Sequence, residues 1–152
     1  MIKAGIGYDL HKLARGRELI IGGEKIESEW GCIAHSDGDV LIHSIIDSIV
    51  SPVLKLDIGK LFPDNDESYK NISSLELLKR VKKEYLKDVK ILSIDSVIVL
   101  DSPKIGDYVK KMIKNISSIL EVDEDIISIK AKTSENTKLF SIEAYTVTLI
   151  EK

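Results

Sequence analysis

The sequence predicts an α/β (α+β) fold in which helices cover one face of a mainly four-stranded sheet. Segments with the short apolar runs typical of strands alternate with segments whose apolar residues recur every four positions, as in helices. The chain has only three prolines, and each lies in or beside an expected turn or loop. Its 152 residues match the size of one domain, so we expect a single domain over residues 1–152.

The first half of the chain predicts a strand, a hairpin and a helix. Residues 2–9 are typical of a strand rich in small residues. Residues 19–26 predict a short hairpin, because Gly22-Gly23 can adopt the positive φ of a tight turn. Apolar pairs recur every four residues over 39–54, which predicts a helix that Pro52 kinks or closes near its end.

The second half predicts two more helices and three more strands. Ser73, with Glu76 three residues later, has the pattern of a capping box and indicates a helix that ends near residue 85. The remaining expected elements are a strand over 90–100, a helix over 109–120, and closing strands over 126–131 and 144–150.

Composition excludes several classes of protein. The net charge is -3, from 22 basic and 25 acidic residues, which gives no reason to expect a nucleic-acid partner. A single cysteine, Cys32, excludes an internal disulfide and a cysteine-based zinc cluster. No apolar run approaches the ~18 residues of a membrane span, and residues 1–7 lack the apolar core of a signal peptide. We therefore expect a cytoplasmic chain with no membrane partner.

Three residues suggest a metal site. On a strand, Asp9 and His11 point to the same side, where a carboxylate and an imidazole can converge. Together with His43 they offer three N/O ligands and leave one position open, as in catalytic zinc sites. The alternative is a surface Asp–His pair and a helix start in which Asp39, His43 and Asp47 share a solvent-facing side. A buried carboxylate behind His43 would instead fix its tautomer.

Three further polar segments suit phosphates, hydroxyl groups or cations. Residues 35–39 precede a helix, whose free N–H groups favour an anion. Residues 57–66 hold three carboxylates but lack the spacing of a calcium loop. Residues 130–135 follow a strand and combine hydroxyls with a carboxylate. The alternative for residues 35–39 is capping of the helix. Taken alone, residues 57–66 would be an ordinary turn-rich loop and residues 130–135 a polar strand end.

Four motifs in this order resemble one family. They are Gly7-Tyr8-Asp9-Leu10-His11, Ala34-His35-Ser36-Asp37-Gly38-Asp39-Val40 with His43, Asp57-Ile58-Gly59-Lys60-Leu61-Phe62-Pro63-Asp64, and residues 130–135. The chain resembles the 2-C-methyl-D-erythritol 2,4-cyclodiphosphate synthase family of non-mevalonate isoprenoid biosynthesis over nearly its whole length. The resemblance implies a homotrimeric lyase with active sites between subunits. It further implies conversion of 4-diphosphocytidyl-2-C-methyl-D-erythritol 2-phosphate to the cyclic diphosphate with release of CMP.

The resemblance also implies residue roles. Asp9, His11 and His43 correspond to the ligands of one zinc ion per subunit. His35 and Thr133 correspond to the catalytic residues, and Glu135 to the ligand of a second divalent cation, magnesium or manganese. The implied substrate-binding residues are Ser36, Asp57, Ile58, Gly59, Phe62, Pro63, Asp64, Asn65, Asp66, Leu100, Asp101, Ser102, Pro103, Lys104, Ile105, Gly106, Ala131, Lys132 and Ser134.

Two departures from the family pattern stand out. The family usually has a glycine-rich segment with an arginine after the position of Glu135, and in the family this arginine lines a central trimer cavity that can hold an isoprenoid diphosphate. Residues 136–142 lack that segment and offer only Lys138, so we expect weak or absent binding of such a ligand. Lys132 also replaces a usual threonine. Two alternatives stay open: a non-enzymatic metal- or nucleotide-binding homologue, and a small metal-dependent phosphohydrolase.

Overall fold

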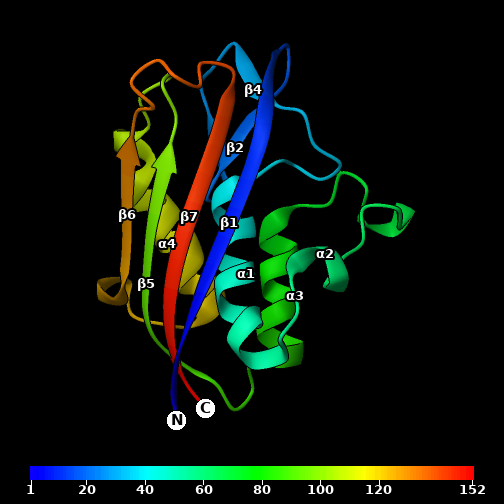
Figure 1. The fold of residues 1–152 in the computed structure, drawn as a ribbon, viewed down its shortest axis with the longest axis vertical. Coiled ribbons are helices and arrows are strands. Elements are labelled where there is room, and N and C mark those ends of the chain that lie inside the picture. The colour runs from blue at the N-terminus through cyan, green and yellow to red at the C-terminus, as the bar shows by residue number, and fades with distance from the viewer.

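The computed structural model describes all of residues 1–152 and contains a five-stranded sheet with the strand order β4-β1-β7-β5-β6 (Figure 1). β5 and β6 run parallel, and the other neighbouring strands run antiparallel. The strands are β1 (Ile2–Arg15), β4 (Trp30–Cys32), β5 (Lys90–Val99), β6 (Ile127–Lys132) and β7 (Ser141–Glu151). The fold class is confirmed, since four longer strands form most of the sheet.

The long antiparallel pair of β1 and β7 forms the centre of this sheet. Its register runs from Ile2 opposite Glu151 to Lys12 opposite Ser141. The two termini therefore lie side by side, and the amino group of Met1 donates to the carbonyl of Lys152 at 2.7 Å. β1 is longer than the predicted strand because its last residues pair with β4, a three-residue strand that was not predicted.

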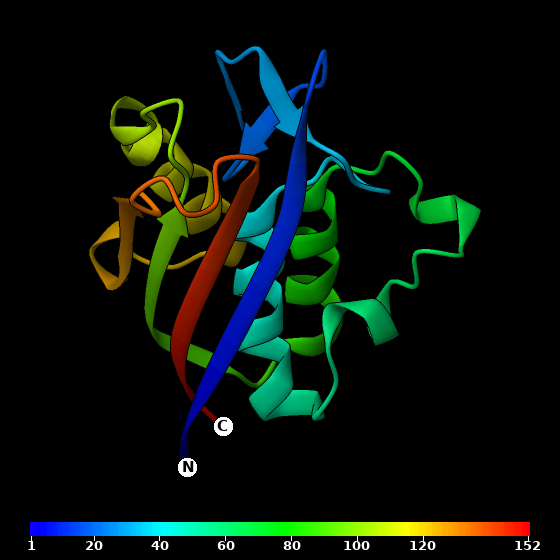
Figure 2. The ribbon, with the colours of Figure 1, turned by 45° about the horizontal axis from the view of Figure 1, so that its top comes forward.

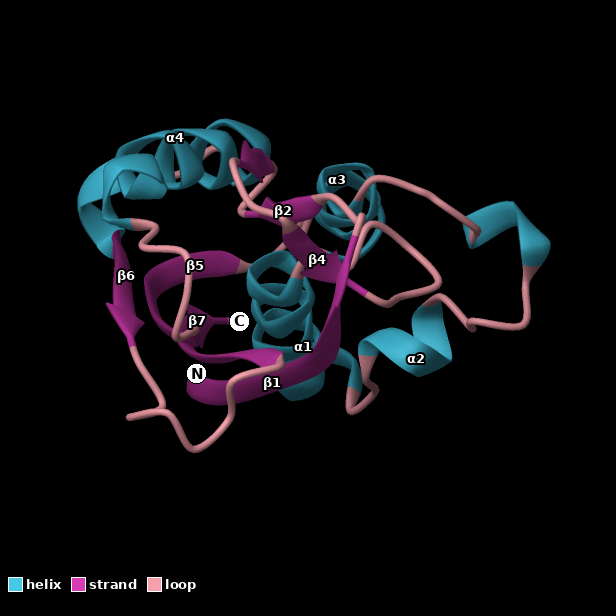
Figure 3. Ribbon diagram, turned by 90° about the horizontal axis from the view of Figure 1, so that it is seen from above, coloured by secondary structure: helices cyan, strands magenta, loops and turns pink.

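The helices cover one face of the sheet (Figure 3). α1 (Val40–Leu54) lies against β1 and β7, α3 (Ser74–Tyr85) packs on α1, and α4 (Val109–Leu120) packs on α3 and β6. The three helices match the predicted segments. α1 ends two residues after Pro52, where Lys55 closes it with φ 58. The core contains 30 buried apolar residues, of which Phe62 alone is aromatic, so Ile, Leu and Val fill most of it.

Shorter elements complete the fold (Figure 2). The predicted hairpin consists of β2 (Leu19–Ile21) and β3 (Glu24–Ile26), and Gly22 and Gly23 turn it with φ 60 and 77. A helix of four residues, α2 (Ile58–Leu61), lies within the predicted 57–66 loop. Single 3-10 turns span Glu67–Tyr69, Gly106–Tyr108 and Glu124–Ile126.

The predicted capping box at the start of α3 is wrong. The Ser73 side chain makes no capping hydrogen bond. Instead, the backbone N–H of Ser74 donates to Oδ2 of Asp37 at 2.8 Å. A carboxylate from a distant loop therefore satisfies the helix end, and no local sequence pattern could have predicted it.

The sheet face opposite the helices carries exposed apolar side chains. They include Ile6, Tyr8 and Leu10 of β1, and Val147 and Leu149 of β7, which are 39–69% exposed. These residues alternate with the helix-facing residues, as the pleat of a strand requires. No helix in the structure has both the length and the apolar character needed to cross a membrane.

Candidate functional site

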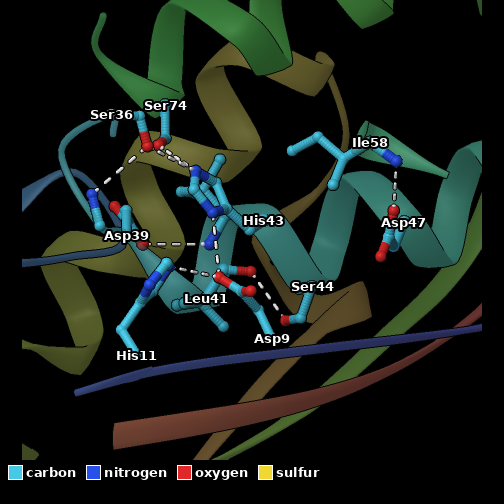
Figure 4. Close-up of polar contacts among 12 residues, drawn as sticks. Asp9, His11, Ser36, Asp39, Leu41, His43, Ser44, Asp47, Ile58 and Ser74 are labelled. Carbon is cyan, nitrogen blue, oxygen red and sulfur yellow. Dashed lines mark hydrogen bonds and ion pairs between the residues drawn. The ribbon is translucent and has the colours of Figure 1, made fainter. Parts of the chain in front are cut away.

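The two strand residues of the predicted metal site meet His43 from α1. The alternation of β1 directs Asp9 and His11 toward the helix layer, and α1 presents His43 in its first turn. The ligand atoms of the three residues all lie within 4.8 Å of one another. Asp9 Oδ2 lies 2.9 Å from His11 Nε2 and 2.9 Å from His43 Nδ1 (Figure 4). The structure thus brings together two imidazole nitrogens and one carboxylate, although His43 lies 34 positions after Asp9 in the sequence.

The electrostatics of this triad suit a bound cation. Burial opposes the ionisation of Asp9, but the adjacent imidazoles of His11 and His43 outweigh it and lower the Asp9 pKa to about 2. His11 Nε2 is buried and makes no hydrogen bond of good geometry, although the carboxylate is close. Ligand atoms that converge on one point, one of them without a hydrogen-bond partner, are the arrangement expected of a metal site. The residues present therefore fit a divalent metal ion with N/O preference.

Two glycines allow α1 to approach β1 closely enough for this convergence. A Cβ atom added to Gly5 would lie 1.8 Å from the carbonyl oxygen of Ser48. One added to Gly7 would lie equally close to that of Ser44. Only glycine permits such a contact between a strand and a helix backbone. The Gly5 and Gly7 pair therefore allows the close approach of the helix that carries His43, a packing role that was not predicted from the sequence.

The other two carboxylates of the α1 face have structural partners and do not contact His43. Asp39 is fully buried and accepts hydrogen bonds from the backbone N–H groups of Gly22, Gly23 and Ile42, so it caps α1 and anchors the hairpin. Burial, followed by the charge of Asp37, raises the Asp39 pKa to about 6. Asp47 accepts from the N–H of Ile58 at 2.6 Å and thereby holds α2. The solvent-facing interpretation of this side of α1 is wrong, because His43 is only 8% exposed.

The triad opens into a cavity of about 150 Å³. Its lining includes nine predicted site residues, namely Asp9, His11, His35, Ser36, His43, Ile58, Gly59, Phe62 and Asp64. The cavity is also lined by Tyr69, Ile72 and Leu77, which were not predicted from the sequence. The rings of Phe62 and Tyr69 pack edge to face with centroids 5.3 Å apart. His35 Nε2 is buried and has no hydrogen-bond partner, so this wall of the cavity holds an imidazole nitrogen free to bind a ligand.

The remaining predicted residues of the 57–66 loop do not line the cavity. Asp57 accepts from the N–H of Lys60 at 2.9 Å, and Asp66 accepts from the N–H of Ser68 at 2.9 Å. These two carboxylates cap short helices, and Pro63 and Asn65 also lie outside the cavity lining. Of the three carboxylates in this loop, only Asp64 faces the candidate site.

A second group of predicted residues gathers where the parallel strands β5 and β6 end. The N–H of Leu100 donates to the carbonyl of Lys132 at 2.9 Å. Asp101 accepts hydrogen bonds from both the backbone N–H and the hydroxyl of Ser134. This contact holds the exposed turn in which Glu135 adopts φ 54 and Thr133 donates to its carboxylate at 3.3 Å.

The two groups do not share a cavity within one chain. None of the residues in 100–106 or 131–135 lines the cavity at the metal triad. Leu100 and Ile105 are buried, at 6% and 2% exposure. The other ten residues of these two segments are exposed or half-buried: Asp101, Ser102, Pro103, Lys104, Gly106, Ala131, Lys132, Thr133, Ser134 and Glu135.

Comparison with known proteins identifies the family. The model described as the YgbB family matches residues 2–151. The 2-C-methyl-D-erythritol 2,4-cyclodiphosphate synthase of Caldicellulosiruptor bescii is 46% identical over 155 residues, which cover 99% of each chain. The enzyme of the same name from Fusobacterium nucleatum is 43% identical over 159 residues, which cover 100% of this chain and 98% of the other.

The structure agrees with these sequence matches. A solved 2C-methyl-D-erythritol-2,4-cyclodiphosphate synthase described as the CDP-bound form superposes with a TM-score of 0.89 at 34% identity. The match covers 98% of this chain and 100% of that chain. The chain therefore belongs to the YgbB family, the family of the 2-C-methyl-D-erythritol 2,4-cyclodiphosphate synthases.

Proposed function

We propose that this chain converts 4-diphosphocytidyl-2-C-methyl-D-erythritol 2-phosphate into 2-C-methyl-D-erythritol 2,4-cyclodiphosphate and releases CMP. An oxygen of the 2-phosphate bonds to the β-phosphorus of the diphosphate. The bond from that phosphorus to the bridging oxygen breaks, and CMP leaves with the oxygen. The observation that carries the proposal is the convergence of Asp9, His11 and His43 beside the free nitrogen of His35 in one cavity.

Asp9, His11 and His43 would hold one zinc ion, with a fourth position open to a phosphate oxygen. When bound, the ion supplies a Lewis acid that reduces the charge repulsion between the two reacting phosphates. No nucleophilic side chain is needed, because the attacking oxygen belongs to the substrate. The protein's contribution is then to hold the two phosphates in line and to keep the nucleophile close.

His35 and Ser36 line the same cavity and are suited to contact the reacting end of the substrate. The partnerless Nε2 of His35 can hydrogen-bond to a phosphate oxygen as negative charge shifts on it. Gly59, Phe62 and Asp64 from the α2 region offer an apolar wall and a carboxylate for the hydroxylated methylerythritol.

The turn at 131–135 and the segment 100–106 are proposed to bind the cytidine and diphosphate. Thr133 would contact the diphosphate, and Glu135 would hold a second divalent cation that bridges it. Both residues are exposed in the chain. The solved relative described as CDP-bound, which shares 34% identity, supports a nucleotide diphosphate as the ligand class.

A homotrimer would bring the two groups together. Within one chain, the metal triad and the 131–135 turn do not share a cavity. The sheet also exposes an apolar face that includes Ile6, Tyr8 and Val147. An exposed apolar patch of this kind is typical of an interface between subunits. We propose that neighbouring copies cover this face and that each active site takes the triad from one copy and the turn from another.

Incubation with the cytidine substrate followed by phosphorus NMR tests the function and separates the alternatives. Equal amounts of CMP and cyclic diphosphate support the synthase. A linear phosphate product would indicate a metal-dependent phosphohydrolase instead. Tight metal and nucleotide binding without any product would indicate a non-enzymatic homologue.

A further inference from the structure

The imidazole of His43 has a second set of partners on the side away from Asp9. Its Nδ1 atom lies 2.9 Å from the Asp9 carboxylate. Its Nε2 atom lies 2.8 Å from the hydroxyl of Ser74 and 3.3 Å from the hydroxyl of Ser36. In Figure 4 the two serine hydroxyls lie on one side of the ring and Asp9 on the other. His43 is thus held at both nitrogens.

Ser74, in turn, is fixed by Asp37. Ser74 is the first residue of α3 and is fully buried. Its backbone N–H donates to Asp37 Oδ2 at 2.8 Å, and its hydroxyl donates to Asp37 Oδ1. Asp37 therefore accepts two hydrogen bonds from Ser74, and the second of them fixes where the Ser74 hydroxyl points.

The hydrogen-bond inventory of these groups places a proton on Nε2 of His43. An ionised carboxylate only accepts, so the single hydroxyl proton of Ser74 points to Asp37. The Ser74 oxygen is then left to accept from His43, which places an imidazole proton on Nε2. Nδ1 lies 2.9 Å from the ionised Asp9 carboxylate and donates to it in the metal-free chain. A metal ion bound at the triad would take the place of this proton and leave the neutral imidazole with its proton on Nε2.

We propose that Asp37 and Ser74 act as positioning residues that fix the tautomer and ring orientation of His43 and thereby strengthen metal binding at the triad. The inference rests on the proposed metal site, and it adds two residues that support this site without being metal ligands themselves. The carboxylates of Asp39 and Asp47, which also lie near this helix face, make no hydrogen bond to the His43 imidazole. Loss of such an outer contact typically weakens metal affinity by roughly 10–100-fold.

The link also ties two elements of the fold to the site. Ser74 begins α3, and Asp37 belongs to the loop before α1. Removal of the hydroxyl takes one hydrogen-bond partner from the half-buried Asp37 carboxylate and one from the buried His43 imidazole, while the helix keeps its backbone bond to Asp37. The expected effect therefore falls on His43 rather than on the helix.

The test compares the zinc affinity of the purified full chain with that of Ser74→Ala by competition with a chromophoric chelator. Ser48→Ala is the matched control, because Ser48 is also fully buried and shares its hydroxyl with Thr148, away from the triad. We expect zinc binding to Ser74→Ala to weaken roughly 10–100-fold and binding to Ser48→Ala to stay within about threefold of the wild type. Equal affinity of Ser74→Ala and the wild type would overturn the inference.

Nitrogen-15 NMR of labelled histidine gives a readout that a purely structural role would not move. The chain has only three histidines, so the ring signals can be assigned with single variants. In the zinc-loaded wild type we expect the His43 proton on Nε2, and in Ser74→Ala a weakened or shifted Nε2–H signal. A proton on Nδ1 of His43 in the zinc-loaded wild type would overturn the inference without any variant. A wild type that binds no zinc would refute the proposed metal site itself, which is a separate result.

Discussion

Gly7 lies so close to Ser44 that a Cβ atom at Gly7 would stand 1.8 Å from the Ser44 carbonyl oxygen. This approach couples the fold to the site, because His43 precedes Ser44 in α1 and Asp9 follows Gly7 on β1 by two residues. The distance between the two elements therefore sets the distance between two candidate ligands.

Gly7→Ala should consequently harm both stability and metal binding. The added methyl group must push α1 away from β1, which we expect to lower the free energy of unfolding by about 1–3 kcal/mol. Gly106→Ala is the control for stability, since a Cβ atom there meets nothing within 4 Å. Denaturant unfolding of both variants checks the prediction, and an unchanged midpoint for Gly7→Ala would contradict it.

Asp39 should make the stability of the protein depend on pH in a defined direction. Burial raises its pKa from 3.8 to about 6, so the folded state retains this proton to a higher pH than the unfolded state. As the pH rises from about 4 to about 6, the unfolded state alone loses the proton, and the contribution of Asp39 to stability falls by about 3 kcal/mol. The free energy of unfolding of the wild type minus that of Asp39→Asn should fall over this range. A difference that is constant with pH would refute the argument.

The one cation of the 136–142 segment is already paired. Lys138 Nζ lies 2.7 Å from Glu143 Oε1, and Glu143 also accepts from the hydroxyl of Tyr8 at 2.8 Å. Burial opposes ionisation of Glu143, but the hydrogen bonds from Lys138 and Tyr8 outweigh it and lower the Glu143 pKa. We therefore expect geranyl diphosphate to bind weakly or not at all in a calorimetric titration. Low-micromolar binding that disappears in Lys138→Ala would show that this lysine is free to take the phosphate.

The exposed sheet face should control assembly. Val147 on β7 is 48% exposed and lies on the face that we propose neighbouring copies cover. Val147→Lys would bury an unpaired charge in that interface, which is costly, so we expect the trimer to dissociate. Light scattering at micromolar protein measures the mass. Ser118→Lys, on the exposed side of α4, should leave the trimer intact. A wild type that is monomeric and fully active would contradict the proposal.

The sequence predicted the local features of the fold well and the non-local ones poorly. The four-residue apolar spacing of 39–54 and the Gly22-Gly23 pair gave α1 and the hairpin, because both depend on neighbours along the chain. β4 was missed, since three residues that include Gly31 carry no readable alternation. Its pairing with the end of β1 is a tertiary contact.

In the candidate site, too, the sequence predicted local features and missed non-local contacts. The two-residue spacing of Asp9 and His11 correctly predicted that both point to one side of a strand. The roles of Asp37 and Ser74 were not predicted, because their contact with each other joins residues 37 positions apart. Ser73 and Glu76 instead suggested a capping box that does not form, since a carboxylate from another loop satisfies the helix end.

The most direct test of the account measures bound metal and product together in the wild type and in Asp9→Ala, His11→Ala and His43→Ala. We expect about one zinc per wild-type chain by elemental analysis, with cyclic diphosphate and CMP formed. Each variant loses one of only three ligands, so its zinc content and its product formation should both collapse. Three folded variants that each retain one zinc per chain and still form the cyclic product would contradict the central claim.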